Sequence, residues 1–293
     1  MKMEKVTDLQ YWMDTHLKTQ LNTICYNMGR DWDFVVIVTG SGLVRVGKSV
    51  IAQQAGYYVA HKMGTPFTLK NVVFDSEELM KTAHQLPLNS VIVYDEARAT
   101  LDAKKVMERI SKTLMDFFAE CGMYNHLIIL VLPDFFELNR RMATTRSDAL
   151  INVFRSAEEK KLQDGTEVLN YKRGYFEFYG KRRKKELYIK GKKAYDNYGV
   201  GKRNFWGEFR EFWVVDKEEY MKKKVTFLRR DRSKKDTHIE SRLGITFKVL
   251  CRYESQRKVS ELLTNEGYKV SQGRINQLIK SISTNTPVSS YDK

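Results

Sequence analysis

The segment that most constrains the fold is a run of β-branched residues followed at once by a glycine-rich loop. Residues 34–39, Phe-Val-Val-Ile-Val-Thr, predict a buried strand, and residues 42–49 follow the pattern Gly-x-x-x-x-Gly-Lys-Ser. The stretch that begins at Val50 is typical of a helix. Strand, loop and helix in this order predict a phosphate-binding loop, because backbone N–H groups and the positive end of a helix dipole face the same anion.

The loop pattern also predicts which side chains handle the nucleotide. Lys48 would reach the β- and γ-phosphates, and Ser49 would bind Mg²⁺, so we expect ATP and Mg²⁺ as cofactors. Residues 43–46, Leu-Val-Arg-Val, are bulkier than the small residues usual in such loops. We expect Arg45 to face solvent, with a phosphate or a neighbouring subunit as alternatives. The predicted nucleotide-binding residues are Gly42, Gly47, Lys48, Ser49 and Val50.

A second apolar strand ends in two carboxylates. Residues 90–94 are followed directly by Asp95 and Glu96, which is typical of a Walker B strand. Asp95 would hold the Mg²⁺ shell through water, and Glu96 would polarise the attacking water as the general base. A hydrolase needs the second acid whereas a phosphate-transfer kinase usually does not. The pair therefore favours hydrolysis.

Strands alternate with helices through residues 31–156, which we expect to form the ATPase core. The alternation predicts an α/β fold whose parallel sheet is covered on both faces, with the phosphate site at the carboxyl edge of the strands. The expected elements are a helix over 48–63 ended by Gly64, a strand over 72–74, a helix capped by Asp75, an amphipathic helix over 106–121, and strands over 126–132 and 149–154.

These motifs together resemble the FtsK/HerA group of DNA-translocating ATPases, which includes zonular occludens toxin-like and viral packaging ATPases. The resemblance covers about residues 30–155 and adds one further feature, the arginine-containing segment 141–148. It implies a RecA-like (ASCE) P-loop NTPase that assembles as a homo-hexameric ring and pumps double-stranded DNA. It also implies that Arg141 or Arg146, with Arg140 as an alternative, acts at the γ-phosphate of the next subunit. The other interpretation is that these arginines pair with surface acids.

The N-terminal residues 1–30 predict one amphipathic helix. Apolar side chains recur at intervals of three and four from Leu9 to Met28, and Thr7-x-x-Gln10 offers a capping box. This helix would pack against its own domain or dock on a neighbouring subunit.

Residues 157–225 predict a basic, β-rich subdomain. The alternation in 175–179 and the stretch 186–189 suggest a hairpin whose tip, 180–185, is strongly basic. Between Lys172 and Lys193 there are ten Lys and Arg against two acids, so the tip would track a phosphate backbone, with a solvated charged loop as the alternative. The predicted contacts are Lys181, Arg182, Arg183, Lys184 and Lys185.

The C-terminal part predicts a second, helical domain. Residues 222–236 form a charged stretch that we expect to be a linker, and residues 237–283 suggest a helix-turn-helix or winged-helix-like domain. Ser255 and Ser271 are natural N-caps. A small helical packing module without DNA contact is the alternative. The predicted recognition-helix residues are Gln272, Arg274, Asn276 and Gln277.

Composition narrows the partners and the compartment. The net charge of +15 and the pI of about 9.5 favour nucleic acid as a partner. Cys25, Cys121 and Cys251 lack a metal-binding spacing and are typical of reduced intracellular thiols. Neither an apolar membrane span nor a signal-peptide pattern occurs, so we expect a cytoplasmic protein, whether encoded by a cell, a virus or a plasmid.

Three functions remain open on the sequence alone. The first is an ATP-hydrolysing motor that translocates DNA, for packaging, transfer or unwinding. The second is an ATP-regulated DNA-binding initiator or switch without processive movement. The third, a small-molecule NTPase or kinase, fits Glu96 and the basic hairpin less well.

Overall fold

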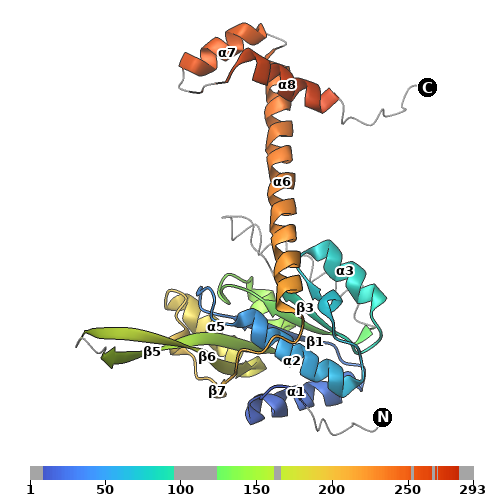
Figure 1. Ribbon diagram of the computed structural model, residues 1–293, viewed down its shortest axis with the longest axis vertical. Helices are drawn as coiled ribbons and strands as arrows, with labels where there is room; N and C mark the ends of the chain where they lie inside the picture. The colour runs from blue at the N-terminus through green and yellow to red at the C-terminus, as the bar shows by residue number, and fades with distance from the viewer. Residues whose placement is uncertain are drawn as a thin grey trace. The chain divides into compact units, whose positions relative to one another are not determined.

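A computed structural model of the chain describes residues 9–95, 124–161, 166–251, 254–265, 268 and 270–283 (Figure 1). The chain divides into two units, Met1–Val225 and Thr226–Lys293. Glu96, Cys121 and the helix expected over 106–121 lie outside the described residues. No helix of the described ranges combines the length and apolar character needed to cross a membrane.

The first unit is built on one mixed sheet of seven strands in the order β2-β3-β4-β1-β5-β6-β7. The five strands from β2 to β5 in this order pair in parallel, and β6 and β7 pair antiparallel. The α/β prediction is therefore confirmed, and the sheet is compatible with a RecA-like fold. The strands are β1 (Phe34–Thr39), β2 (Val72–Val73), β3 (Val91–Asp95), β4 (Leu127–Val131), β5 (Ala149–Lys161), β6 (Glu167–Gly180) and β7 (Phe205–Glu208).

The central strands are apolar along their whole length because both of their faces are covered. β3 and β4 are buried at every position, and β1 at all but its first. Runs of Val, Ile and Leu suit such strands, since alternation is required only where one face meets water. β4 lies between β1 and β3. Its residue Ile129 pairs with Val36 of β1 on one side and with Val93 of β3 on the other. The loop after β1 is thereby separated from the end of β3 by one strand.

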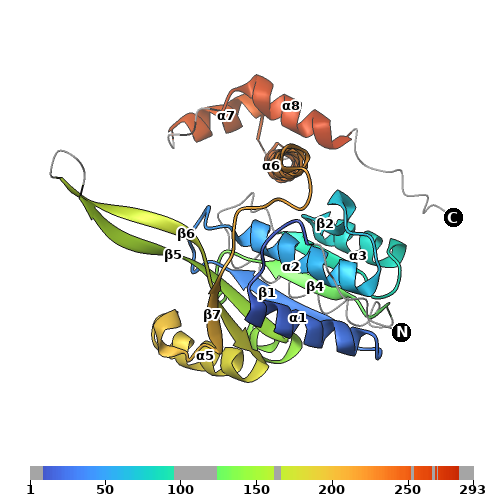
Figure 2. The same cartoon turned by 60° about the horizontal axis from the view of Figure 1, so that its bottom comes forward.

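Two layers of helices enclose the sheet (Figure 2). α1 (Thr15–Met28) packs on α2 (Lys48–Met63), which contacts β1, β3 and β4. On the other face, α3 (Ser76–Gln85) and α5 (Lys181–Lys193) contribute to one apolar cluster with the strands. Short turns of helix occur at Leu69–Asn71, Met142–Arg146 and Tyr198–Val200.

Helix boundaries follow the caps that the sequence offers. The Asp75 carboxylate accepts the N–H of Glu78 at 2.8 Å, and Gly64 ends α2 with φ 69°, both as expected. α1 begins later than expected because Asp14 caps it. Its apolar side packs within its own unit, where Tyr58 donates to Asn22 at 2.8 Å. Thr7 of the expected capping box lies outside the described residues.

The predicted basic hairpin is wrong. Residues 181–193 form α5, and residues 175–179 of β6 pair instead with β5 and β7. The physical reason is a helical repeat of buried residues in α5, spaced by three, one and three positions. These residues are Lys184, Leu187, Tyr188 and Gly191.

The second unit has a small core of its own. α6 (Lys217–Leu250) is a single helix through the stretch expected to be a linker, and the division of the chain falls within it. Phe247 of α6 packs with residues of α7 (Gln256–Asn265) and α8 (Gln272–Ser283). The hydroxyls of Ser255 and Ser271 accept backbone N–H groups in the first turns of α7 and α8. The buried residues are Phe247, Val259, Ile275 and Leu278.

Candidate functional site

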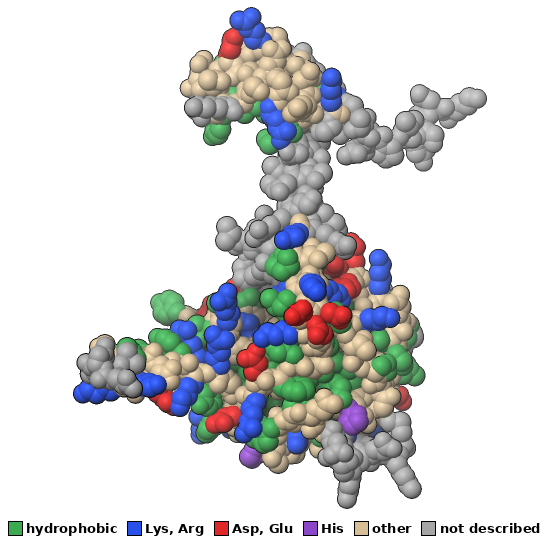
Figure 3. All heavy atoms as spheres, viewed as in Figure 1, with side chains coloured by type: hydrophobic (Ala, Val, Ile, Leu, Met, Phe, Trp, Pro, Cys, Tyr) green, Lys and Arg blue, Asp and Glu red, His purple; other side chains and the backbone are tan. Residues whose placement is uncertain are grey.

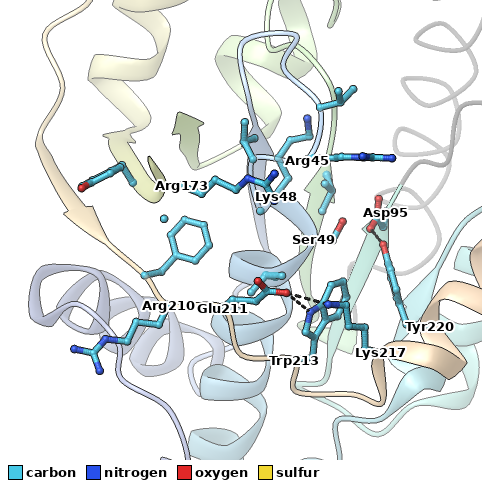
Figure 4. A pocket seen from close by; sticks show the side chains of 18 of the residues that line it. Arg45, Lys48, Ser49, Asp95, Arg173, Arg210, Glu211, Trp213, Lys217 and Tyr220 are labelled. Carbon is cyan, nitrogen blue, oxygen red and sulfur yellow. Dashed lines mark hydrogen bonds and ion pairs between the residues drawn. The ribbon is translucent and has the colours of Figure 1, made fainter. Parts of the chain in front are cut away.

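A pocket of about 970 Å³ opens at the carboxyl edge of the parallel strands (Figure 4). The glycine-rich loop and the first residues of α2 form one wall, and Asp95 lies at the end of β3. The remaining wall comes from β6 and from residues 208–224, which lie far from the loop in sequence. Carboxyl ends of parallel strands are where ligands bind in open α/β sheets.

The loop backbone is shaped for an anion. Gly47 precedes α2 with φ 103°, and a side chain there would meet the ring of Phe209 at 2.8 Å, so both conformation and space require glycine. Lys48 and Ser49, the first two residues of α2, line the pocket, and N–H groups at the start of a helix have no partner within the helix. Ser41 and Arg45 also adopt positive φ values, of 49° and 59°. Such strain in non-glycine residues clusters at functional sites.

Neighbouring strands hold the loop in place. The N–H of Gly42 donates to the carbonyl of Pro133 after β4 at 2.9 Å. The buried side chain of Asn152 on β5 accepts the hydroxyl of Ser41 at 3.0 Å. Lys48 donates to the carbonyl of Leu43 within the loop, at 2.5 Å. The ammonium group therefore lies beside the loop backbone.

Asp95 is held by the beginning of α6. The Tyr220 hydroxyl donates to Asp95 Oδ2, and Lys224 Nζ lies 3.3 Å from Oδ1. Lys224 also donates to the Tyr220 oxygen at 3.0 Å. Burial, followed by the charge of Asp95, raises the pKa of Tyr220, so the phenol stays protonated and serves as a donor.

The residues predicted for magnesium fit that ion. The Tyr220 hydroxyl that binds Asp95 also contacts the Ser49 side chain, so one hydroxyl reaches both groups. A carboxylate and a hydroxyl are hard oxygen ligands, and Mg²⁺ needs few protein ligands because phosphates and water complete its shell. In the described ranges, no cluster of three or more His, Cys, Asp or Glu could hold a metal ion. The fit depends on Ser49 and Asp95 alone.

The predicted finger arginines lie at the opposite edge of the sheet. Arg141 and Arg146 flank the turn that leads into β5, whose first residue pairs with Val36 near the start of β1. Because β1 and β5 are parallel, the turn before β5 and the loop after β1 lie at opposite ends of these strands. The distance between them is about the length of a six-residue strand, roughly 17–20 Å. Both side chains are exposed. A role for either one at the pocket of its own chain is therefore excluded by distance.

Lys184 is not a surface residue, contrary to the prediction. Its side chain is fully buried, and its ammonium group donates to the carbonyl of Ala143 and, at 2.7 Å, to the hydroxyl of Ser147. Burial lowers the pKa of Lys184 to about 7. Its place in the structure is to hold the turn that carries Arg141 and Arg146.

The other predicted DNA contacts are on two helices. On α5, Lys181, Arg182 and Lys185 are exposed and Arg183 is half-buried. On α8, Gln272, Arg274 and Gln277 are exposed and Asn276 is half-buried, while Ile275 and Leu278 face the core. Figure 3 shows further Lys and Arg side chains along the arm formed by β5 and β6. The predicted residues therefore present a polar face on each of the two helices.

Sequence patterns missed most residues of the far wall of the pocket, among them Arg173, Phe209, Tyr220 and Lys224. They come from β6, from the segment after β7 and from α6, all beyond the region with recognisable motifs. Residues 209–216, here called the strap, cross α2, where Gln54 donates to the carbonyls of Arg210 and Phe212 at 2.8 and 3.0 Å. Residues 205–220 are rich in aromatic side chains, a composition that indicates packing rather than a site.

Comparison with known proteins adds no family to these observations. A scan against protein-family models gives no match to the chain, and a search of curated proteins gives none either.

Proposed function

We propose that the chain is a Mg²⁺-dependent ATPase that acts on DNA as a translocating motor in a ring of identical subunits. The observation that carries the nucleotide part is the meeting of Lys48, Ser49 and Asp95 in one pocket at the carboxyl edge of the sheet. Lys48 would bind the β- and γ-phosphates, and Ser49 and Asp95 would hold Mg²⁺, which supplies charge neutralisation of the phosphates when bound. Glu96, next in sequence, would orient the attacking water.

The DNA part is supported by charge. The chain carries a net charge of +15, and Lys and Arg gather on α5 and along the β5–β6 arm. Neutralising phosphates with such side chains releases counterions and favours binding at low salt. The exposed polar face of α8 is a second candidate contact.

The decisive experiment measures ATP turnover with and without duplex DNA, together with displacement of a protein roadblock bound to that DNA. We expect DNA to stimulate turnover and the roadblock to be displaced only with ATP. Lys48→Ala should abolish both, because it removes the phosphate-binding charge. Glu96→Gln should retain ATP and Mg²⁺ binding but lose hydrolysis. Native turnover by the Glu96 variant would remove that residue from the role of general base.

A second function, an ATP-regulated DNA-binding switch, is favoured by one observation. Asp95 is held by Tyr220 and Lys224 of α6, the helix that continues along the chain into the second unit. A switch of this kind would show nucleotide-dependent DNA affinity with no roadblock displacement.

A further inference from the structure

The beginning of α6 engages both oxygens of the carboxylate predicted to serve the metal. Tyr220 donates to Asp95 Oδ2, and Lys224 lies 3.3 Å from Oδ1. The two residues are four apart in α6, so they project from the same face of the helix. Asp95 itself is only 3% exposed, which leaves little room for a further ligand beside them.

The Tyr220 hydroxyl also lies between the two predicted metal ligands. It binds Asp95 and contacts the side chain of Ser49. Ser49 and Asp95 offer a hydroxyl and a carboxylate, the oxygen ligands of a hard cation. In the structure, the groups beside them are a phenol hydroxyl and the ammonium of Lys224. Lys224 therefore supplies the positive charge that Asp95 would otherwise receive from Mg²⁺.

This contact is fixed by packing rather than being a loose surface pair. Tyr220 is 1% exposed, and its ring lies 5.7 Å from that of Phe74 and 5.1 Å from that of Trp213. The neighbouring Lys223 binds Glu78 and the carbonyl of Val72, both at 2.6 Å. The first turns of α6 are thus anchored on β2 and α3 as well as on Asp95.

We propose that Tyr220 and Lys224 engage Asp95 in place of the hydrated Mg²⁺ that this carboxylate would hold, so that Mg²⁺-nucleotide and the start of α6 compete for Asp95. The inference rests on the nucleotide site of the proposed function. Lys224 and Mg²⁺ are both cations and repel each other when both lie beside the Asp95 carboxylate. Mg²⁺ binding therefore favours withdrawal of Lys224. By linkage, the contact of α6 with Asp95 weakens Mg²⁺-nucleotide binding by the same factor by which Mg²⁺-nucleotide weakens that contact. The second unit would sense the nucleotide through this end of α6.

The test uses the full chain and a non-hydrolysable ATP analogue, with affinity measured by calorimetry in Mg²⁺ and in EDTA. The quantity of interest is the factor by which Mg²⁺ increases affinity. Lys224→Met should raise this factor at least about fivefold, the lower end of typical couplings. Lys222→Met is the control, since Lys222 lies in the same part of α6 and its side chain is exposed. The control should leave the factor unchanged.

Tyr220→Phe keeps the packed ring and removes only the hydroxyl, so it tests the contact even if Lys224→Met folds poorly. It should also raise the Mg²⁺ factor. In the wild type, hydrogen exchange in peptides spanning residues 217–225 should increase with Mg²⁺ and analogue but not with the analogue in EDTA. Unchanged factors in both variants, or unchanged exchange, would overturn the inference while leaving the ATPase proposal intact. Absence of analogue binding by the wild type would overturn both.

Discussion

At the scale of single residues, Arg173 brings a cation to the glycine-rich loop from within the same chain. It lines the pocket from β6, and Figure 4 shows its side chain extending toward the loop and Lys48. Arg210 lines the same pocket but its side chain points away from the loop in that view. The two arginines line the same pocket, but their side chains point in different directions. Arg210 can therefore serve as the control for substitutions of Arg173.

We expect Arg173→Ala to weaken nucleotide binding about tenfold and Arg210→Ala to have little effect. An arginine beside a triphosphate forms charge-assisted hydrogen bonds, and a tenfold change corresponds to about 1.4 kcal/mol. The affinity for a fluorescent ATP analogue measures the effect. Arg173→Lys should recover part of the affinity that Arg173→Ala loses. Equal nucleotide affinities for the two alanine variants would show that Arg173 is a surface charge that does not contact the nucleotide.

Lys184 makes a prediction about pH. Its pKa in the folded chain is about 7, lowered by burial, whereas an unfolded lysine titrates near 10.4. Between these values the unfolded state binds one more proton, so this group makes the free energy of unfolding rise with pH. Below about pH 7 both states are protonated and the contribution is constant.

Relative to Lys184→Met, the wild type should therefore gain stability from pH 7 to pH 10, by at most about 1.4 kcal/mol per pH unit. Denaturant unfolding of both proteins at pH 6, 8 and 9.5 measures the difference. A difference that stays constant with pH would mean that Lys184 is charged in the folded chain throughout this range.

At the scale of elements, sequence patterns predicted the parts whose burial is regular. The strand from 34 to 39, α2 with its terminal Gly64 and the strand that ends at Asp95 all read directly from apolar runs and caps. The prediction for α5 is wrong because it equates charge with exposure, whereas one of the five consecutive basic residues 181–185 is buried. The helical repeat of buried residues in α5 is visible only when Lys184 is counted together with the apolar residues.

Two other failures have a different cause, the lack of a regular apolar pattern in the sequence. β5 continues to Lys161 and its last residues are exposed on both sides, so no alternation marks them. Much of α6 is charged all round, and its residues favour a helix by propensity without an apolar stripe. For the site, residues within the loop motif were predictable. Tyr220 and Lys224 were not, because only the path of the strap brings them to Asp95.

The exposed side of α5 gives a prediction for DNA binding. Arg182→Gln with Lys185→Gln removes two charges that face solvent, without touching Lys181, which pairs with Asp148 at 3.0 Å. If both contact phosphates, the slope of log affinity against log salt should fall by about 1.8, that is 0.9 for each contact on duplex DNA. The matched control, Lys70→Gln with Lys81→Gln, removes two exposed charges from another surface. Identical slopes for the two double variants would exclude α5 from the interface.

At the scale of the whole molecule, the proposed function implies that the two edges of the sheet would carry complementary halves of a catalytic site. The carboxyl edge holds the loop, Lys48 and Asp95, and the amino edge holds Arg141 and Arg146. A single chain cannot bring these together. In a head-to-tail ring, the amino edge of one subunit would face the pocket of the next, and the site would be completed at each interface.

This arrangement predicts complementation between inactive variants. An arginine supplied in trans stabilises the γ-phosphate transition state and is worth about 10³ to 10⁵ in rate where measured. Specific ATPase activity of the wild type should therefore rise with protein concentration. Arg141→Ala or Arg146→Ala chains mixed with Lys48→Ala chains should recover turnover, because some interfaces then pair an intact loop with an intact arginine. Chains mixed with a second copy of the same variant serve as the control and should stay inactive. Activity that is independent of concentration in a protein that remains monomeric with ATP and DNA, or native turnover by both arginine variants, would show that the site is complete within one chain.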